Sequence, residues 1–189
     1  MKVGTTLLCR TRAEWRAWLA KNYATAPDIW LIYFKKNSGK SSVAYADAVE
    51  EALCYGWIDS IAKGRDAESW VQRFSPRRPK SVLSELNKER IRKMIRQKKM
   101  RAAGLRSVAH HLDGASQKSP TRFVFPKDIL DILRKDPLVW KHYRSFPLSY
   151  RRIRIGWIDS VRNRPQEFRK RLAFFIKKTK AGTMFGSRG

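Results

Sequence analysis

Strand-forming sequence is confined to the first 76 residues of this chain, and this limits the folds that the chain can adopt. A β-branched and aromatic run occupies residues 29–34 (IWLIYF), and two further runs, 57–62 (WIDSIA) and 69–75 (SWVQRFS), flank the turn sequence KGRD. Runs of this composition are typical of strands, and two that are joined by a short turn predict an antiparallel hairpin. The sequence therefore predicts a small antiparallel sheet in the N-terminal part.

Helical periodicity surrounds these runs and fills the rest of the chain. Thr11 and Glu14 fit a capping box, and Gly56 is suited to end a helix. Pro137 and Pro165 fit the first position of a helix, and Ser81 is the expected N-cap of a long basic helix. Helices are predicted at 11–23, 45–56, 81–99, 101–112, 126–135, 136–146, 148–163 and 165–178. The expected fold class is α+β, a small antiparallel sheet with flanking helices followed by a helical C-terminal segment.

A polar stretch with Gly and Ser, residues 113–125, interrupts this pattern and is the predicted linker. We therefore expect an α+β domain over residues 1–112 and a helical segment over 126–180. The Gly-rich residues 181–189 are expected to form a flexible tail.

The pentapeptide GWIDS occurs twice, at residues 56–60 and 156–160. The first copy follows a helix stop and is expected to enter a strand. In the second, Tyr150, Ile153 and Trp157 recur at the spacing of one helix face. The flanking sequences also differ, so we interpret the repeat as coincidence rather than internal duplication and expect one site.

The charge indicates the kind of partner. The chain has 42 Lys and Arg against 16 Asp and Glu, a net charge of +26. Such a surplus repels itself in a compact chain, which favours a polyanionic partner such as RNA or a ribonucleoprotein. An anionic lipid surface is the second candidate, and a basic protein without such a partner is the third possibility. Residues 1–56 have 8 basic and 5 acidic side chains, so most of the surplus lies beyond them.

Several classes of site are not expected. Cys9 and Cys54 are too few for a disulfide framework, and we expect Cys54 to be a buried structural thiol. The three histidines are not at metal-ligand spacing, and the SGKSS turn has Phe34 where a phosphate-binding loop needs glycine. No metal, cofactor or catalytic residue is predicted.

Because no apolar run is long enough for a membrane span or signal peptide, we expect a cytoplasmic protein, with organelle import as the alternative.

Residues 72–90 (QRFSPRRPKSVLSELNKER) are the most informative stretch. A helix start offers unpaired N–H groups and a partial positive charge, and guanidiniums beside it favour phosphate binding. The alternative is a solvated, well-capped basic helix start. The predicted anion-binding residues are Arg73, Arg77, Arg78, Lys80, Ser81, Ser84, Lys88, Arg92, Lys93 and Arg96. Such side chains fix phosphates but read no base sequence.

A second hypothesis is an enzyme or small-molecule-binding protein that acts on an anionic metabolite. Its pocket would lie between the strands and the 81–97 helix and use Asp59 and Arg77. Asp59 is expected opposite Arg73 across the hairpin, in an orienting ion pair, and on the face of Trp57 and Ile61. Trp57 and Lys36 are further pocket candidates. A third hypothesis is a structural component of an RNA-containing assembly.

The motifs EALCYGWIDS and FSPRRPKS resemble the YdeI/OmpD-associated family, often labelled bacteriocin-protection proteins. The resemblance covers about residues 12–112, and the C-terminal stretch from residue 125 is similar to the family's helical OmdA-like segment. It implies an α+β N-terminal part related to the YjbR/CyaY-like fold, a link to tolerance of bacteriocins or antimicrobial peptides, and no established reaction. The family often has Gly-x-Met-Thr-x-Ala-Gly where this chain has KKMRAAG, with Arg101 in place of the Thr. A chain of this charge repels cationic peptides, so protection would act through an anionic intracellular partner.

Overall fold

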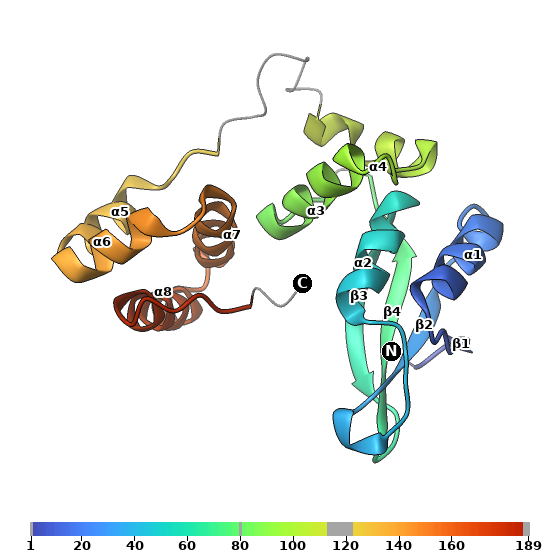
Figure 1. Ribbon diagram of the computed structural model, residues 1–189. Coiled ribbons are helices and arrows are strands. Elements are labelled where there is room, and N and C mark those ends of the chain that lie inside the picture. Colours follow the sequence, from blue (N-terminus) through green and yellow to red (C-terminus); the bar gives the residue numbers. More distant parts are fainter. Residues whose placement is uncertain (1, 80, 113–122, 187–189) are drawn as a thin grey trace. The chain divides into compact units, whose positions relative to one another are not determined.

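The computed structural model describes residues 2–79, 81–112 and 123–186 (Figure 1). Contacts within the chain divide it into two compact units. Unit 1 comprises Met1–Ser81 and Arg90–Ser116, and unit 2 comprises Val82–Glu89 and Gln117–Gly189. The predicted linker lies largely outside the described residues.

Unit 1 contains a four-stranded sheet of order β1-β2-β4-β3. The strands are β1 (Thr6–Leu7), β2 (Ile29–Phe34), β3 (Trp57–Gly64) and β4 (Ser69–Pro76). The predicted hairpin of β3 and β4 is confirmed, and β4 also pairs antiparallel with β2. The short parallel strand β1, beside β2, was not predicted. A bulge between Asp59 and Ala62 shifts the register of β3. The expectation that Ile61 lies on the same face of the strand as Trp57 is therefore wrong.

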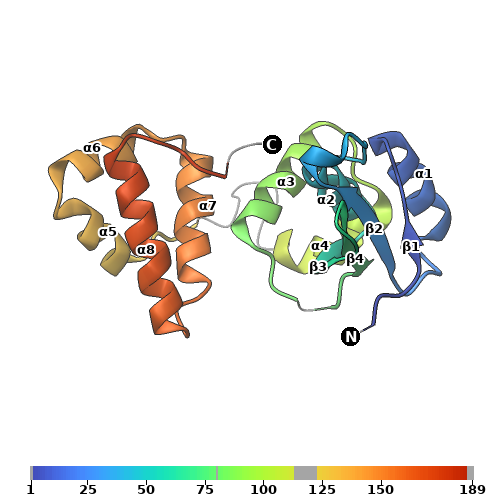
Figure 2. The ribbon, with the colours of Figure 1, turned by 90° about the horizontal axis from the view of Figure 1, so that it is seen from below.

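Both faces of this sheet are covered, which explains why the β2 sequence is continuously apolar. On one face Trp15 of α1 (Arg12–Asn22) packs against Phe74, with ring centroids 5.4 Å apart. The Trp15 indole N–H also donates to the Ala48 carbonyl of α2 (Tyr45–Cys54), which joins the two helices. Figure 2 shows α1 and α2 beside the strands of the sheet. On the other face Trp30 and Ile32 form a buried cluster with Val71, against which Val3 and Leu8 pack.

Two further helices, α3 (Glu85–Arg96) and α4 (Ala102–Leu112), follow the hairpin, and one 3-10 turn, η1 (Lys36–Ser38), follows β2. Gly56 has φ +77 at the end of α2, as its predicted capping role requires. The prediction that Ser81 caps α3 is wrong. The Ser84 hydroxyl accepts from the Asn87 N–H at 3.2 Å, while the Ser81 hydroxyl donates to the Arg78 carbonyl. Ser84 is favoured because it places the Glu85 carboxylate in the first turn, near the positive end of the helix.

Unit 2 is helical, as predicted, with α5 (Lys127–Arg134), α6 (Pro137–Ser145), α7 (Leu148–Asp159) and α8 (Pro165–Lys180). Asp136 caps α6 by accepting from two backbone N–H groups, with Pro137 in the first turn. The core contains Ile129, Leu133, Tyr143, Ile155, Ile158 and Phe175. The second GWIDS copy lies on α7 and the first opens β3, which confirms that the repeat has two unrelated settings. Among the described residues, no helix is long and apolar enough to cross a bilayer.

Candidate anion-binding surface

The structure places Arg73 on β4 with a carboxylate partner other than the predicted one. Its guanidinium donates to Asp28 at 2.7 and 3.1 Å, and Asp59 instead accepts from the Tyr45 hydroxyl. Asp59 is in register with Phe74, the neighbour of Arg73. Because neighbouring side chains on a strand point to opposite faces, Asp59 and Arg73 cannot meet, and the predicted ion pair is wrong.

Arg77 braces the segment that leads from β4 toward α3. Its guanidinium donates to the Ser81 carbonyl at 2.8 Å, and its backbone N–H donates to the Gly56 carbonyl at 2.9 Å. Burial lowers the pKa of Arg77. Arg78 is exposed, and Lys80 lies outside the described residues. Since the helix start lies at Ser84 rather than Ser81, anion binding by this segment stays a prediction.

The predicted cations on α3 differ in how far they are neutralised. Lys88 pairs with Glu85 at 2.6 Å, and Lys93 pairs with Glu50 of α2 at 2.8 Å. Arg92 is half-buried, whereas Arg96, in the last turn, is exposed. The C-terminal end of α3 therefore offers more positive charge to a ligand than its start.

The three pocket candidates of unit 1 do not form a common pocket. Trp57 is 1% exposed, and its indole N–H donates to the Tyr23 carbonyl, so it belongs to the core. Lys36 follows the end of β2 that pairs with Ser69, whereas Arg77 follows the opposite end of β4. Asp59 is bound by Tyr45, whose pKa is raised by burial and by the bond to Asp59.

The turn that joins α3 and α4 holds a dense group of cations in unit 1, of which Arg96 was predicted as a site residue and the other three were not. We name it the basic turn; its cations are Arg96, Lys98, Lys99 and Arg101. Within the described ranges, none of these four side chains forms an ion pair with a carboxylate. The sequence signal was available, because no acidic residue lies between Glu89 and Asp113.

The backbone of the basic turn is held in place. Lys98 N–H donates to the Ile95 carbonyl and Lys99 N–H to the Met94 carbonyl, both at 2.9 Å, which closes α3. The Arg101 N–H donates to the carbonyl of Cys54, and Arg16 donates to the Lys99 carbonyl. The cations are therefore presented on a fixed loop, which lowers the entropy cost of binding.

The carboxylates of the described residues are occupied within the protein. Each accepts at least one hydrogen bond or ion pair from a side chain or backbone group. The partners include Arg12, Arg16, Arg73 and Lys93 in unit 1, and Arg134, Arg162, Arg171 and Lys180 in unit 2. The surplus of positive charge is therefore left on the other Lys and Arg side chains.

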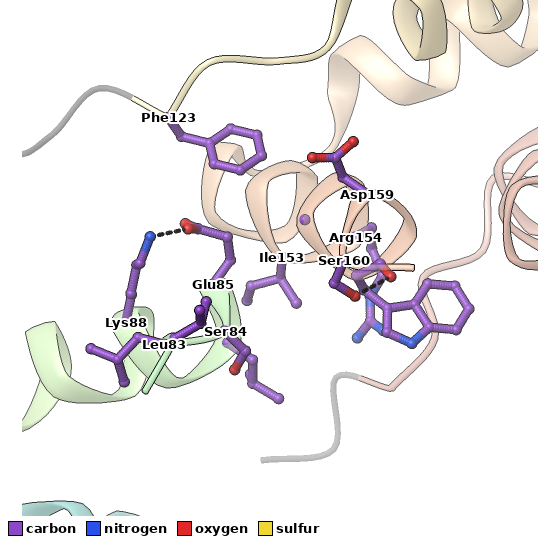
Figure 3. Close-up of a pocket in the computed structure, with 13 residues that line it drawn as sticks. Leu83, Ser84, Glu85, Lys88, Phe123, Ile153, Arg154, Asp159 and Ser160 are labelled. Atoms are coloured by element: carbon purple, nitrogen blue, oxygen red, sulfur yellow. Dashed lines mark hydrogen bonds and ion pairs between the residues drawn. The ribbon is translucent and has the colours of Figure 1, made fainter. Parts of the chain in front are cut away.

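Unit 2 contains a pocket of about 360 Å³ between the residues at the start of α3 and the second half of α7 (Figure 3). Its apolar lining includes Ile153 and Trp157. The Glu85–Lys88 ion pair lies at one side of it, as Figure 3 shows. Ser84 and Lys88, two of the predicted anion-binding residues, line it, whereas Asp59 and Arg77 do not. This pocket therefore differs from the predicted one, which was to lie against the strands.

Nucleophilic and metal chemistry find no support in the described ranges. Cys9 and Cys54 are buried, as predicted for Cys54, and burial raises the pKa of both thiols to about 11. They are therefore protonated at neutral pH and poor nucleophiles. No group of three or more His, Cys, Asp or Glu side chains that could hold a metal ion occurs among the described residues.

Two family models match different parts of the sequence. The model of a domain of unknown function, DUF8412, matches residues 7–107, more than half of the chain. The OmdA model, described as "Bacteriocin-protection, YdeI or OmpD-Associated", matches residues 122–182. No curated protein and no solved structure matches the chain. The chain therefore belongs to the DUF8412 family and carries an OmdA domain of the YdeI/OmpD-associated type in its C-terminal part.

Proposed function

We propose that this protein binds RNA through phosphate groups, with the basic turn as the main contact of unit 1. The proposal depends on one observation: among the described residues, the carboxylates are paired within the protein, and the cations of the basic turn are not paired with carboxylates. The described carboxylates are paired with groups of the protein itself, while Arg96, Lys98 and Arg101 are exposed without a carboxylate partner in the described part of the chain. A net charge of +26 then acts on the surroundings rather than within the fold.

Lys and Arg side chains on a fixed turn bind phosphates by releasing the counterions of the nucleic acid. Of the residues first predicted for the site, Arg78 and Arg96 are exposed and can extend the contact along a strand. The function does not require base recognition, because phosphate contacts fix position and carry no sequence information.

A salt titration of RNA binding tests the proposal. The logarithm of the binding constant should fall linearly with the logarithm of salt concentration. For a single strand, the slope should be about −0.7 for each phosphate contact. Replacing Lys98 and Arg101 by Glu should weaken binding at least tenfold. A control is Lys36→Glu, which reverses the exposed cation at the first position of η1. Absence of RNA binding at low salt, or a binding constant that does not change with salt concentration, would contradict the proposal.

A small-molecule function is a second candidate, favoured by the pocket of unit 2. Its volume of about 360 Å³ lies in the range of ligand sites. A thermal-shift screen of phosphorylated and carboxylated metabolites should give a hit that Ile153→Trp abolishes and Lys98→Ala leaves unchanged. If no such compound shifts the unfolding temperature, this candidate is removed.

We also propose that any role in bacteriocin tolerance acts through RNA or a ribonucleoprotein in the cytoplasm. The description of the OmdA model names bacteriocin protection, but many such peptides are cationic and would be repelled. The purified protein should therefore not bind a cationic peptide at low salt, whereas it should co-purify with RNA. Direct peptide binding would contradict this part of the proposal. Stable co-sedimentation with ribosomal particles would instead favour a structural role in such an assembly.

A further inference from the structure

The outward face of α6 combines an aromatic ring with cations. Pro137, Trp140, Lys141 and Arg144 recur at helical spacing and line one surface hollow of about 480 Å³, together with Ser145. The opposite face of α6 is buried in the core of unit 2 through Val139 and Tyr143. The hollow therefore belongs to a helix whose position is fixed by packing.

The charges of this hollow are unbalanced. Lys141 and Arg144 are exposed, and neither forms an ion pair with a carboxylate anywhere in the described residues. No Asp or Glu lines the hollow. The carboxylate of the adjacent Asp136 caps α6 and pairs with Lys180. The lining thus attracts a negatively charged group.

The indole of Trp140 lies beside these cations, is partly buried against the core of unit 2, and already contacts two side chains. It stacks on Tyr143 with centroids 5.4 Å apart, and the Arg134 guanidinium lies 4.9 Å from its centroid. Arg134 is held by an ion pair with Asp131 in which both side chains are 48% exposed. Exposed ion pairs of this kind contribute little to the free energy of folding. An incoming aromatic ring can therefore displace Arg134 from the indole.

We infer that this hollow binds one nucleotide of single-stranded RNA, with the base against Trp140 and Pro137 and a phosphate between Lys141 and Arg144. Aromatic rings that take up bases beside a cationic groove are the common design of single-strand binding. A base inside a duplex is stacked on both sides and cannot reach the ring, so the hollow should discriminate against duplexes. The inference rests on the proposed RNA function and specifies the form of RNA that unit 2 prefers.

The test compares binding of the full chain to a 12-nucleotide single strand and to a duplex of the same length at one salt concentration. Trp140→Ala should weaken single-strand binding roughly tenfold, as expected for loss of one stacked base. Its salt slope should stay unchanged, and duplex affinity should stay within about twofold of the parent. Trp140→Phe keeps a stacking ring and should retain most of the affinity.

Two further variants complete the design. Leu138→Ala is the matched control, because Leu138 is exposed on the same helix but does not line the hollow. Combined replacement of Lys141 and Arg144 by Ala should reduce the single-strand salt slope by about 1.4, the value for two phosphate contacts. An unfolding temperature for each variant separates loss of binding from loss of fold, and Trp140→Phe provides the comparison if Trp140→Ala unfolds.

The outcomes separate this inference from the proposed function. If the parent protein binds RNA with the expected salt slope, but Trp140→Ala and Trp140→Phe leave single-strand binding unchanged, only the α6 site is wrong. Equal losses for strand and duplex would likewise overturn it. If the parent binds neither RNA at low salt, the proposed function fails as well. Binding of an acidic peptide that Trp140→Ala abolishes, with RNA binding unaffected, would assign the hollow to a protein partner.

Discussion

Lys98 of the basic turn has a backbone conformation that is unfavourable for a residue with a side chain. It has φ 55, the left-handed conformation that closes α3, and it is the sole non-glycine residue with positive φ among the described residues. A side chain costs roughly 1 kcal/mol in this conformation. A lysine therefore stands at a position where the backbone conformation favours glycine. The strain agrees with a binding role for the basic turn.

Lys98→Gly should therefore change stability and binding in opposite directions. We expect the free energy of unfolding to rise by about 0.5–1 kcal/mol, because glycine adopts this conformation without a steric cost. RNA affinity should fall, and the salt slope should lose about one phosphate contact. The control, Lys98→Ala, should lose the same affinity without the gain in stability. Urea denaturation and a salt titration measure both effects; unchanged stability would show that the turn is unstrained.

Gly104 on α4 is constrained by close approach rather than by φ. A Cβ at this position would lie 2.3 Å from the Cys54 carbonyl oxygen and 2.6 Å from that of Leu53. We expect Gly104→Ala to destabilise the protein by about 3 kcal/mol, because backbone of α2 or α4 must move. Gly64→Ala is the control, since a Cβ there meets nothing within 4 Å. Equal unfolding midpoints in urea for the two variants would contradict the observed packing.

At the scale of elements, a cluster of charged side chains joins α1, α2 and α3. Arg12 donates to Glu51 at 2.6 Å, to Asp47 at 2.7 Å and to Glu50 at 3.0 Å, and Lys93 of α3 also binds Glu50. Glu50 and Glu51 are 6% and 2% exposed. Although burial lowers the pKa of Arg12, its bonds and proximity to Glu51 raise it further, so the guanidinium stays charged. Buried carboxylates of this kind are tolerated because each is paired.

Breaking this cluster should be costly. Glu51→Gln removes the charge that Arg12 and Arg16 face, and we expect a loss of about 3 kcal/mol in the free energy of unfolding. Glu68→Gln breaks an exposed pair with Lys40, in which both side chains are more than 50% exposed, and should cost less than about 1 kcal/mol. Denaturant unfolding at pH 7 measures both. A smaller effect for Glu51→Gln than for Glu68→Gln would show that the cluster does not stabilise unit 1.

Glu50 should make unit 1 sensitive to acid. Burial raises its pKa, but hydrogen bonds from Lys93 and Arg12 outweigh this, so the pKa of folded Glu50 lies below its ordinary value of 4.5. A depressed folded pKa contributes stability that is present above about pH 4.5 and is lost as pH falls through the folded value. We expect the free energy of unfolding to fall between about pH 5 and pH 3. Glu50→Gln should flatten this dependence; an unchanged pH profile would contradict it.

At the scale of the whole molecule, the C-terminal segment completes unit 2. The ring of Phe185 lies 4.8 Å from that of Phe174, and the Arg154 guanidinium lies 4.5 Å from its centroid. Arg154 also donates to the Gly186 carbonyl at 3.1 Å, and the Phe185 N–H donates to the Tyr150 hydroxyl. A flexible tail was predicted over residues 181–189, yet Phe185 and Gly186 pack on α7 and α8. Residues 187–189 lie outside the described residues. The sequence alone did not distinguish an aromatic anchor from a loose end.

Phe185→Ala should therefore destabilise unit 2 locally. We expect a loss of about 2 kcal/mol, because a partly buried aromatic ring leaves a cavity. Hydrogen exchange should become faster in α7 and α8 while the sheet of unit 1 keeps its protection. Met184→Ala, a neighbouring residue that is 45% exposed, serves as the control. Equal exchange in parent and variant would mean that Phe185 contributes no packing energy.

Local signals predicted most elements and part of the candidate surface. Periodicity and caps located α1, α2, α6 and α8, because those signals depend on neighbours within a few residues. The start of α3 was placed at Ser81 because two serines offered the same cap and only the fold selects between them. The charge surplus was evident, whereas its concentration in the basic turn depended on which carboxylates neutralise Lys88 and Lys93.

The sequence by itself determined the α+β class, the helical C-terminal part and the excess of positive charge. These follow from apolar spacing and composition, which act through neighbouring residues or through simple totals. Only the tertiary structure decided which charges remain accessible. Arg73 pairs with Asp28 and Arg12 with Glu51, partners that lie 45 and 39 residues apart in the sequence. These side chains meet only when the chain has folded. Long-range pairing therefore decides where a basic chain can bind an anion.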